Sequence, residues 1–418
     1  MNQTSIPFHE LAARGVACAT LVLSCGGSLA QDALQSALEG NTAYRARNAT
    51  AGPAEGNPSI GPVKLQADAS YALEWNDNIR YATNAEADIS HAVQVNLRAA
   101  WPITQGSMLN FGMGVGYRAY QRNSDLDRLF IAPDSELAWD IPVEDFVFSP
   151  YDRFSYSQDV ISQGAISGVA EFPRFENTAG LRVEWNPAQY VFQLSYGHEI
   201  FAPETATFAY LARASDQFFG SAGWRFAADA VGGAEISASL TDYVSGQNDN
   251  RNLSAGPFVE WQMTPWFNLN LRGGVVRYSF ASPVAGGNPD LLSYYVNCEA
   301  RHRATEFLSH GLTLRRDVQQ GLNQGSQVIE QLSTHYFIAW AFHRSVSLQT
   351  DFWYEHSREP QFGVVEIFDR YGFSLGLTAQ PLKHLGVGLT YRYALKDSNF
   401  NWRDYAQNVV TMNINYVF

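Results

Sequence analysis

The sequence predicts an all-β fold: a transmembrane, antiparallel, up-and-down β-barrel of about 18 strands (16–18) after a signal peptide and a flexible leader. Three observations lead to this prediction. Apolar and polar side chains alternate along most of the chain, the alternation breaks at regular intervals, and tryptophans gather near one set of breaks. Together they describe strands of similar length whose two faces differ in polarity.

The composition of the 418 residues excludes several other classes. Aromatic residues make up 14% of the chain, which does not suit a disordered protein. The mean hydropathy is −0.21, and no apolar run reaches the roughly 18 residues of a membrane helix. The formal net charge of −13 argues against nucleic acid as a partner, because phosphate binding needs a basic face.

Residues 1–30 have the pattern of a secretory signal peptide. Arg14 precedes a short apolar run, Val16–Leu23, and small residues at Ser28 and Ala30 favour cleavage before Gln31. Lipidation of Cys25 is the alternative, although Leu23 is bulkier than the usual lipidation box prefers.

Residues 31–62 follow as a flexible periplasmic leader. The segment has many Ala, Gly, Asn and Pro residues and no sustained apolar period, apart from a short helix that Asp32–Glu39 would allow. Cleavage leaves Cys298 as the single cysteine of the mature chain, so the fold does not depend on an internal disulfide.

Residues 63–418 alternate with a period of two, which assigns them to the barrel. One such segment carries Leu109, Phe111, Met113, Val115 and Tyr117 on one face and polar or glycine residues on the other. The alternation often lasts about 9–13 residues, the length at which a tilted strand crosses a bilayer. Strands of a soluble sandwich are typically about 5–6 residues long.

Short and long breaks in the apolar–polar alternation follow each other in a regular order along the chain. Short breaks, about 40 residues apart, fall near Pro102, Pro142, Pro187, Asp229, Pro265, Thr305, Arg344 and Leu382. Longer polar breaks are expected at Asn76–Asp88, Gln121–Asp127, Ser157–Pro173, Ala202–Arg213, Ser245–Asn252, Ala281–Asp290, Asp317–Gln327, Ser357–Phe362 and Lys396–Asp404. Eight short turns and nine long loops join eighteen strands and leave both termini at the short-turn end. Ser157–Pro173, the longest loop, either folds inward as a constriction or stays exposed.

Tryptophans near the short turns predict an aromatic girdle at one membrane boundary. They are Trp101, Trp139, Trp185, Trp224, Trp261, Trp266 and Trp340. A soluble core would scatter such residues through the repeat.

The last strand resembles the assembly signal of bacterial outer-membrane barrels. Val410, Met412, Ile414, Tyr416 and the terminal Phe418 share one face. The resemblance implies that Tyr416 and Phe418 form the assembly signal, that the protein is located in the bacterial outer membrane in contact with its lipid, and that barrel-insertion machinery and periplasmic chaperones are its partners during biogenesis.

An eighteen-strand barrel leaves an aqueous lumen unless a plug or loop fills it. Parity places these residues on the pore-lining face: Arg98, Arg118, Arg182, Glu184, Arg225, Glu260, Arg272, Glu299, Arg301, Arg315 and Arg392, together with Arg303, Glu176, Glu235 and Asp351. The long loops are rich in Asp and Glu. Two interpretations stay open, and both can hold: the excess of arginine sorts anions, or the charged residues pair across strands as a structural network.

Catalytic and metal-binding patterns are weak. The chain has no Gly-x-Ser-x-Gly elbow and no His-Glu-x-x-His pair, so we expect no enzyme, no cofactor and no metal site. His302, His310, His335, His343 and His356 have no carboxylate at metal-ligand spacing. Asp77 and Asp249 lie in Asn-Asp-Asn triplets that could ligate calcium, but turn formation explains them more simply.

The triplet Asn76-Asp77-Asn78 followed by Ile79, after a Gly/Pro-rich leader, is similar to outer-membrane barrel proteins of exopolysaccharide and exosortase systems; the barrel also resembles the porin-2-like group. These resemblances imply a conduit for polysaccharide or another polar, including anionic, solute. A non-conducting scaffold barrel of a surface-polymer secretion system and, less expected, an outer-membrane hydrolase are the alternatives.

Overall fold

The computed structural model describes residues 58–418 except 161–163, 246, 283–289 and 362. Before residue 58 it describes nine positions of the leader: 33, 34, 37–39, 42–44 and 47. The predicted signal peptide lies outside the described residues.

Eighteen long antiparallel strands form one sheet in which each pairs with the next along the chain. The first nine are β2 (Val63–Asn76), β3 (Asp88–Pro102), β4 (Met108–Tyr120), β5 (Arg128–Val143), β6 (Phe146–Ser157), β7 (Arg174–Trp185), β8 (Tyr190–Pro203), β9 (Arg213–Ala227) and β10 (Ala230–Tyr243). The others are β11 (Asn250–Thr264), β12 (Phe267–Phe280), β13 (Asp290–Arg303), β14 (Leu308–Gln320), β15 (Val328–His343), β16 (Val346–Gln361), β17 (Val364–Leu382), β18 (Leu385–Ser398) and β19 (Tyr405–Val417).

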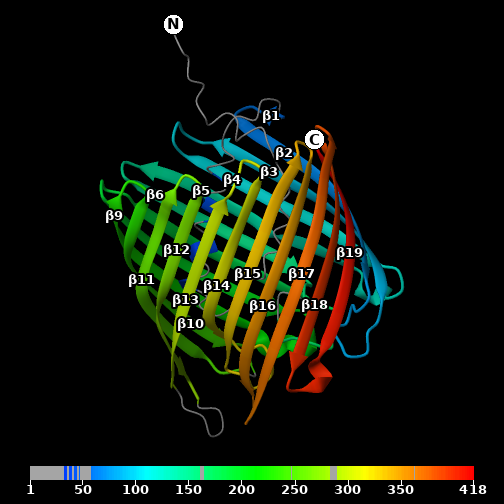
Figure 1. The fold of residues 1–418 in the computed structure, drawn as a ribbon. Coiled ribbons are helices and arrows are strands. Elements are labelled where there is room, and N and C mark those ends of the chain that lie inside the picture. Colours follow the sequence, from blue (N-terminus) through cyan, green and yellow to red (C-terminus); the bar gives the residue numbers. More distant parts are fainter. Residues whose placement is uncertain are drawn as a thin grey trace.

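Pairing of the last strand with the first closes the sheet into a barrel. Val409 of β19 lies opposite Asn76 of β2, and Tyr416 lies opposite Ala69. Figure 1 shows the closed barrel, with the start of β2 and the C-terminus at the same end. Closure pairs the backbone groups that a free sheet edge would expose to lipid. The predicted fold class and strand number are therefore confirmed.

Smaller elements complete the described chain. The two-residue strand β1 (Ser59–Ile60) pairs with β2, and three 3₁₀ helices, η1 (Ser124–Leu126), η2 (Ala206–Leu211) and η3 (Asn401–Arg403), lie in long loops. Within the described part, no helix has the length and apolarity needed to cross a membrane.

All eight short turns fall where the breaks in the alternation predict them, and long loops alternate with them. The loop predicted at Ser357–Phe362 is wrong: β16 continues to Gln361 and β17 starts at Val364. Glu359 pairs with Glu366 and Pro360 with Val365. The pattern misleads here because both strand faces become polar, with Ser357 and Glu359 buried on one face and Arg358 exposed on the other.

The outer surface is apolar and exposed. On β3, for example, Val93, Val95 and Leu97 are exposed on the same face, whereas the intervening Gln94 and Asn96 hydrogen-bond to each other at 2.6 Å. The seven tryptophans predicted to form the girdle are all exposed and lie close to short turns. Their role at a membrane boundary stays a prediction.

The main apolar cluster lies where the long loops meet the barrel interior. Tyr81, Phe172, Phe208 and Leu322 come from four loops and pack with wall residues such as Phe368. Loop 158–173 therefore folds inward, which selects the first of the two expectations for this segment. The long-loop end of the lumen is narrowed by packed side chains.

Candidate functional site: a constriction in the barrel lumen

Loop 158–173 follows β6, and its described residues reach the wall at β18, six strands away around the barrel. There, Lys396 Nζ on β18 donates hydrogen bonds to the Ala165 carbonyl at 3.4 Å and to Ser167 Oγ at 3.0 Å. The Gly168 N–H donates to the Tyr81 carbonyl at 2.9 Å, which joins this loop to loop 77–87. These contacts hold loop 158–173 across the lumen.

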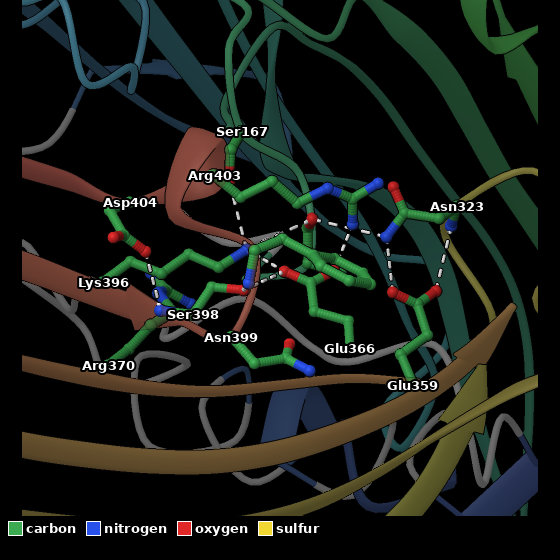
Figure 2. Close-up of polar contacts among 12 residues, drawn as sticks. Ser167, Asn323, Glu359, Glu366, Arg370, Lys396, Ser398, Asn399, Arg403 and Asp404 are labelled. Atoms are coloured by element: carbon green, nitrogen blue, oxygen red, sulfur yellow. Dashed lines mark hydrogen bonds and ion pairs between the residues drawn. The ribbon is translucent and has the colours of Figure 1, made fainter. Parts of the chain in front are cut away.

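The loop is anchored by a buried charge cluster on β16, β17 and β18, shown in Figure 2. Lys396 Nζ lies 3.2 Å from a Glu366 carboxylate oxygen, and both side chains are fully buried. Arg403 and the Ser398 hydroxyl also donate to Glu366. Two cations thus neutralise one carboxylate, which is the condition for keeping charges in a water-poor site.

A second carboxylate holds the loop that follows β14. Glu359 accepts hydrogen bonds from the backbone N–H groups of Leu322 and Asn323, both at 3.0 Å, and from the Asn323 side-chain amide. Asn323 in turn reaches the Ala165 carbonyl at 3.5 Å. Lys396, Glu366 and Glu359, which we call the anchor, therefore connect loop 158–173 and the loop after β14 to one stretch of the wall.

Arg370 on β17 extends this polar wall. Its guanidinium bonds to Glu355 at 2.6 Å and lies over the Trp353 ring at 5.0 Å. Gly164 of the inward loop lies against it: a Cβ at this position would be 2.4 Å from Arg370 Nη1. A side chain here would push the guanidinium away, so glycine lets the loop backbone lie this close to the arginine.

Beside this anchor, two arginines face an acidic and a phenolic group from the loops. Asp159 is close enough to Arg118 on β4 to stabilise its positive charge, and Arg118 also lies 3.8 Å from Glu74. Burial raises the pKa of the Tyr81 hydroxyl, an effect that Asp159 adds to and Arg392 on β18 opposes. We call Tyr81, Arg118, Asp159 and Arg392 the constriction.

Arg392 differs from the other arginines of this wall. Its Nε is buried without a hydrogen bond, and no carboxylate of the described residues forms an ion pair with it. A guanidinium without a fixed counter-ion at a narrow point is available to a passing anion.

The described residues of the leader lie in the same lumen. Leu34 and Ala37 are buried in a cluster with the wall residues Phe219 and Tyr295. Glu39 lies 3.5 Å from Arg153 on β6. These leader residues are helical, so the short helix allowed at Asp32–Glu39 is present at the described positions.

Arg47 attaches the C-terminal end of the described leader residues to the barrel wall. It donates to both Asp140 oxygens, at 3.0 and 3.1 Å, and to Glu136 at 2.6 Å, all on β5. Tyr44 lies beneath the Arg182 guanidinium at 4.5 Å. The sequence offered no binding partner for this segment, yet its described side chains contact the inner wall. The domain limits 31–62 and the flexibility of the segment stay predictions.

No protein-family model matches the chain, and no curated protein is similar to it in sequence. The chain is similar in structure to OccK5 (OpdH) of Pseudomonas aeruginosa, with a TM-score of 0.51 and 12% identity over 86% of this chain and 99% of that one.

The fold is that of a bacterial outer-membrane porin. Further solved structures from Pseudomonas aeruginosa include OpdQ (TM-score 0.49, 9% identity, 86% of this chain and 99% of that chain) and the outer membrane protein OpdK (TM-score 0.47, 11% identity, 85% and 99%). The likeness to OccK5 (OpdH) and the closed eighteen-strand sheet confirm, at the level of the fold, the prediction of a porin-like outer-membrane barrel.

Within this porin-like barrel, most residues predicted to line the pore lie in ion pairs with neighbours. Arg272 bonds to Glu235 and Glu260, and Arg182 bonds to Glu184. Further pairs are Arg98–Asp134 at 3.8 Å, Arg301–Glu299 at 2.5 Å and Arg315–Asp317 at 2.6 Å, and the His335 ring lies 3.3 Å from Asp351. Arg225 donates to the carbonyls of Ala188 and Tyr190. This arrangement matches the structural-network interpretation, whereas Arg118 and Arg392 alone lie at the constriction.

Several residues of the site were missed by sequence reasoning. Arg370 and Lys396 have the inward parity of their strands, so the alternation could have found them. Glu39 and Arg47 carry no such signal, because nothing in the leader sequence indicates the wall residues that it contacts.

The histidines and triplet aspartates have local partners. His302 Nδ1 lies 3.1 Å from His310 Nε2, without a carboxylate in the pair. Asp249 accepts the Tyr243 N–H within its own loop, as in a turn, whereas Asp77 accepts the N–H of Asn408 on β19, both at 2.7 Å. Among the described residues, no group of three His, Cys, Asp or Glu side chains is placed to hold a metal ion.

Proposed function

We propose that the protein is an outer-membrane channel for small polar solutes and that the constriction gives it a preference for anions. The observation that carries this proposal is Arg392, an arginine without a carboxylate partner among the described residues, at the narrow part of a barrel with an apolar exterior. Fixed positive charge at a constriction raises the local concentration of anions and lowers their barrier to passage.

The packed interior supports small solutes over a polymer. Four loops contribute to the apolar cluster at the long-loop end, and described leader residues contact the wall. A polysaccharide chain would need a continuous wide path. We therefore prefer a solute channel to the polysaccharide conduit that the exopolysaccharide resemblance implies.

The experiment is a liposome-swelling series with a neutral sugar, a sugar acid and an amino sugar of similar size, together with conductance in planar bilayers. We expect discrete conductance steps and faster entry of the sugar acid than of the amino sugar. Equal entry of the three solutes would contradict anion preference.

A second candidate function is a non-conducting scaffold barrel. It is favoured by one observation: residues of the long loops and the described residues of the leader lie in the lumen. Electrical silence at every voltage, in the wild type and after removal of residues 33–47, would support this function and contradict the channel.

The last strand supports the expected route of assembly. Tyr416 and Phe418 are exposed, their rings meet edge to face at 5.2 Å, and the Phe418 N–H donates to the Ala67 carbonyl of β2 at 2.9 Å. We propose that these two aromatic residues are accessible to the barrel-insertion machinery before the β19–β2 seam closes. Periplasmic chaperones would carry the unfolded chain to this step.

A further inference from the structure

The pairing between β13 and β14 stops before either strand ends. Their register runs from Arg303 opposite Ser309 to Val296 opposite Arg316. Beyond that point, the described residues 290–295 of β13 pair with β12 alone, whereas β14 stays paired with β15 up to Gln320 opposite Val328. The two strands therefore part at the long-loop end of the barrel wall.

The end of β14 separates because it turns into the lumen. Asp317, Val318, Gln319 and Gln320 are all buried, whereas alternation along a wall strand would expose every second one. The Tyr278 hydroxyl of β12 donates to the Val318 carbonyl at 3.2 Å. As a result, Leu292 and Tyr294 of β13, 73% and 53% exposed, lie beside a strand edge on the outer surface.

Arg316 lies at the point where the strands part. Its guanidinium stacks on the Tyr294 ring at 3.8 Å and donates to Ser293 Oγ at 3.1 Å and to the Tyr294 carbonyl. It also pairs with Glu330 of β15 at 2.7 Å, and Arg358 of β16 reaches the same carboxylate at 3.5 Å.

More positive charge lies on the other side of the split. Arg277 of β12 is 61% exposed and bonds to Asp290 at 2.7 Å. Arg251 of β11 shares its outward face with the exposed Leu253. Together with Arg316 and Arg358, they are the outward-facing arginines and lysines among the described strand residues. All four lie near the long-loop ends of β11 to β16.

We call Arg251, Arg277, Arg316 and Arg358 the outer arginine cluster. Asp290 and Glu330 pair with three of these arginines, and Asp242 of β10, on the same outward face as Leu240, lies on the strand beside Arg251. Other strand ends on this outer surface present His356 with Asp369 and His198 with Asp216, so the cluster is distinguished by its grouped guanidinium groups and not by a net positive charge.

We propose that the outer arginine cluster binds the phosphate-bearing headgroup of a membrane lipid, with an acyl chain lying on Leu292 and Tyr294. Guanidinium groups match phosphate oxygens with paired hydrogen bonds. Cations at the membrane boundary attract anionic lipid headgroups. The exposed side chains beside the arginines supply the apolar contact that a free phosphate ion would not use. This inference rests on the membrane location in the proposed function, but not on conduction.

The split strand edge gives the lipid a structural purpose. A strand edge that faces lipid leaves some polar backbone groups without partners. Headgroup oxygens can accept from such groups, while the acyl chain covers Leu292. A bound lipid would thereby seal the wall where β13 and β14 part.

The test compares the wild type with R277Q/R316Q/R358Q and a matched control, R303Q/R344Q/K383Q, which removes three cations at the short-turn end. Each protein is purified in a non-ionic detergent, and retained lipid is measured as organic phosphate per barrel and by native mass spectrometry. We expect the wild type and the control to retain phosphorylated lipid. Losing charge-assisted hydrogen bonds should weaken retention in the first variant by about tenfold or more.

A second arm separates the possible sources of phosphate. In zwitterionic vesicles, added phosphatidic acid should raise the thermal unfolding midpoint of the wild type and control but not of R277Q/R316Q/R358Q, whereas inorganic phosphate should raise none. The proposal would be overturned by any of three results. These are equal lipid retention in all three proteins, an equal rise of the unfolding midpoint with inorganic phosphate, and a dimer joined through the β13 edge in place of lipid. Heat-modifiable gel migration shows whether each variant is folded. Conductance of R277Q/R316Q/R358Q should equal that of the wild type, so a loss of lipid binding can be told apart from a failure of the channel proposal.

Discussion

Lys396 on β18 and Glu366 on β17 form an ion pair of 3.2 Å between two fully buried side chains, and Lys396 also holds the inward loop through the Ala165 carbonyl and Ser167. One ammonium group thus links the barrel wall to the segment that narrows the lumen. The alternation places Lys396 on the inner face, but the loop partner comes from more than 200 residues away in the chain.

Lys396→Met should release loop 158–173 without unfolding the barrel. The loss of stability should stay below the roughly 3–5 kcal/mol typical of a broken buried pair, because Arg403 still neutralises Glu366. We expect noisier and larger single-channel currents than in the wild type. Lys383→Met, in a short turn, is the control, and identical currents in both variants would contradict the anchoring role.

Arg392→Gln should lower anion preference. Removing one fixed charge at the constriction should cost a permeating anion about 1 kcal/mol of attraction, a roughly fivefold drop in the anion-to-cation permeability ratio. Reversal potentials across a salt gradient measure this ratio. An unchanged ratio in Arg392→Gln and in its combination with Arg118→Gln would remove the constriction from the selectivity mechanism.

Arg272→Gln should act on stability instead. Arg272 lies between Glu235 and Glu260, and Glu235 is buried. Loss of the guanidinium leaves that carboxylate with the Tyr295 hydroxyl at 3.0 Å as its hydrogen-bond donor among the described residues, at a cost of roughly 3–5 kcal/mol. Denaturant unfolding should show the loss, and Glu235→Gln in the same protein should recover part of it. Wild-type stability of Arg272→Gln would contradict the structural role.

Removal of residues 33–47 should enlarge the conductance, because the described leader residues occupy the lumen. Arg47→Gln should reproduce part of the effect, since each charge-assisted hydrogen bond to Asp140 or Glu136 is worth about 1.5–3 kcal/mol. Lys64→Gln, just after the leader, is a suitable control. A deletion that leaves every current level unchanged would show that the leader does not obstruct the path.

Acid should loosen loop 77–87. Arg80 donates to Glu86 at 2.6 Å, and this hydrogen bond, together with one from Asn123, holds the pKa of Glu86 below its ordinary value. A lowered carboxylate pKa contributes stability above the ordinary value, and that contribution is lost as the pH falls through the lowered one. Current noise should therefore rise in acid in the wild type and be less pH-dependent in Glu86→Gln. Identical acid profiles would contradict this assignment.

The local alternation of side chains was enough to predict the barrel, the short turns and the inward face, because successive strand residues point to opposite sides whatever they contact. It failed at Ser357–Phe362, where both faces turn polar at the end of β16, and at the end of β14, where four consecutive residues are buried.

By itself, the sequence determined that apolar side chains would cover one face of eighteen strands and that arginines would line the other. Only the tertiary structure decided which arginine lacks a carboxylate partner among the described residues, which loop crosses to Lys396, and where β13 parts from β14. Those outcomes depend on contacts between segments far apart in the chain, and a pattern with a period of two carries no information about such distant partners.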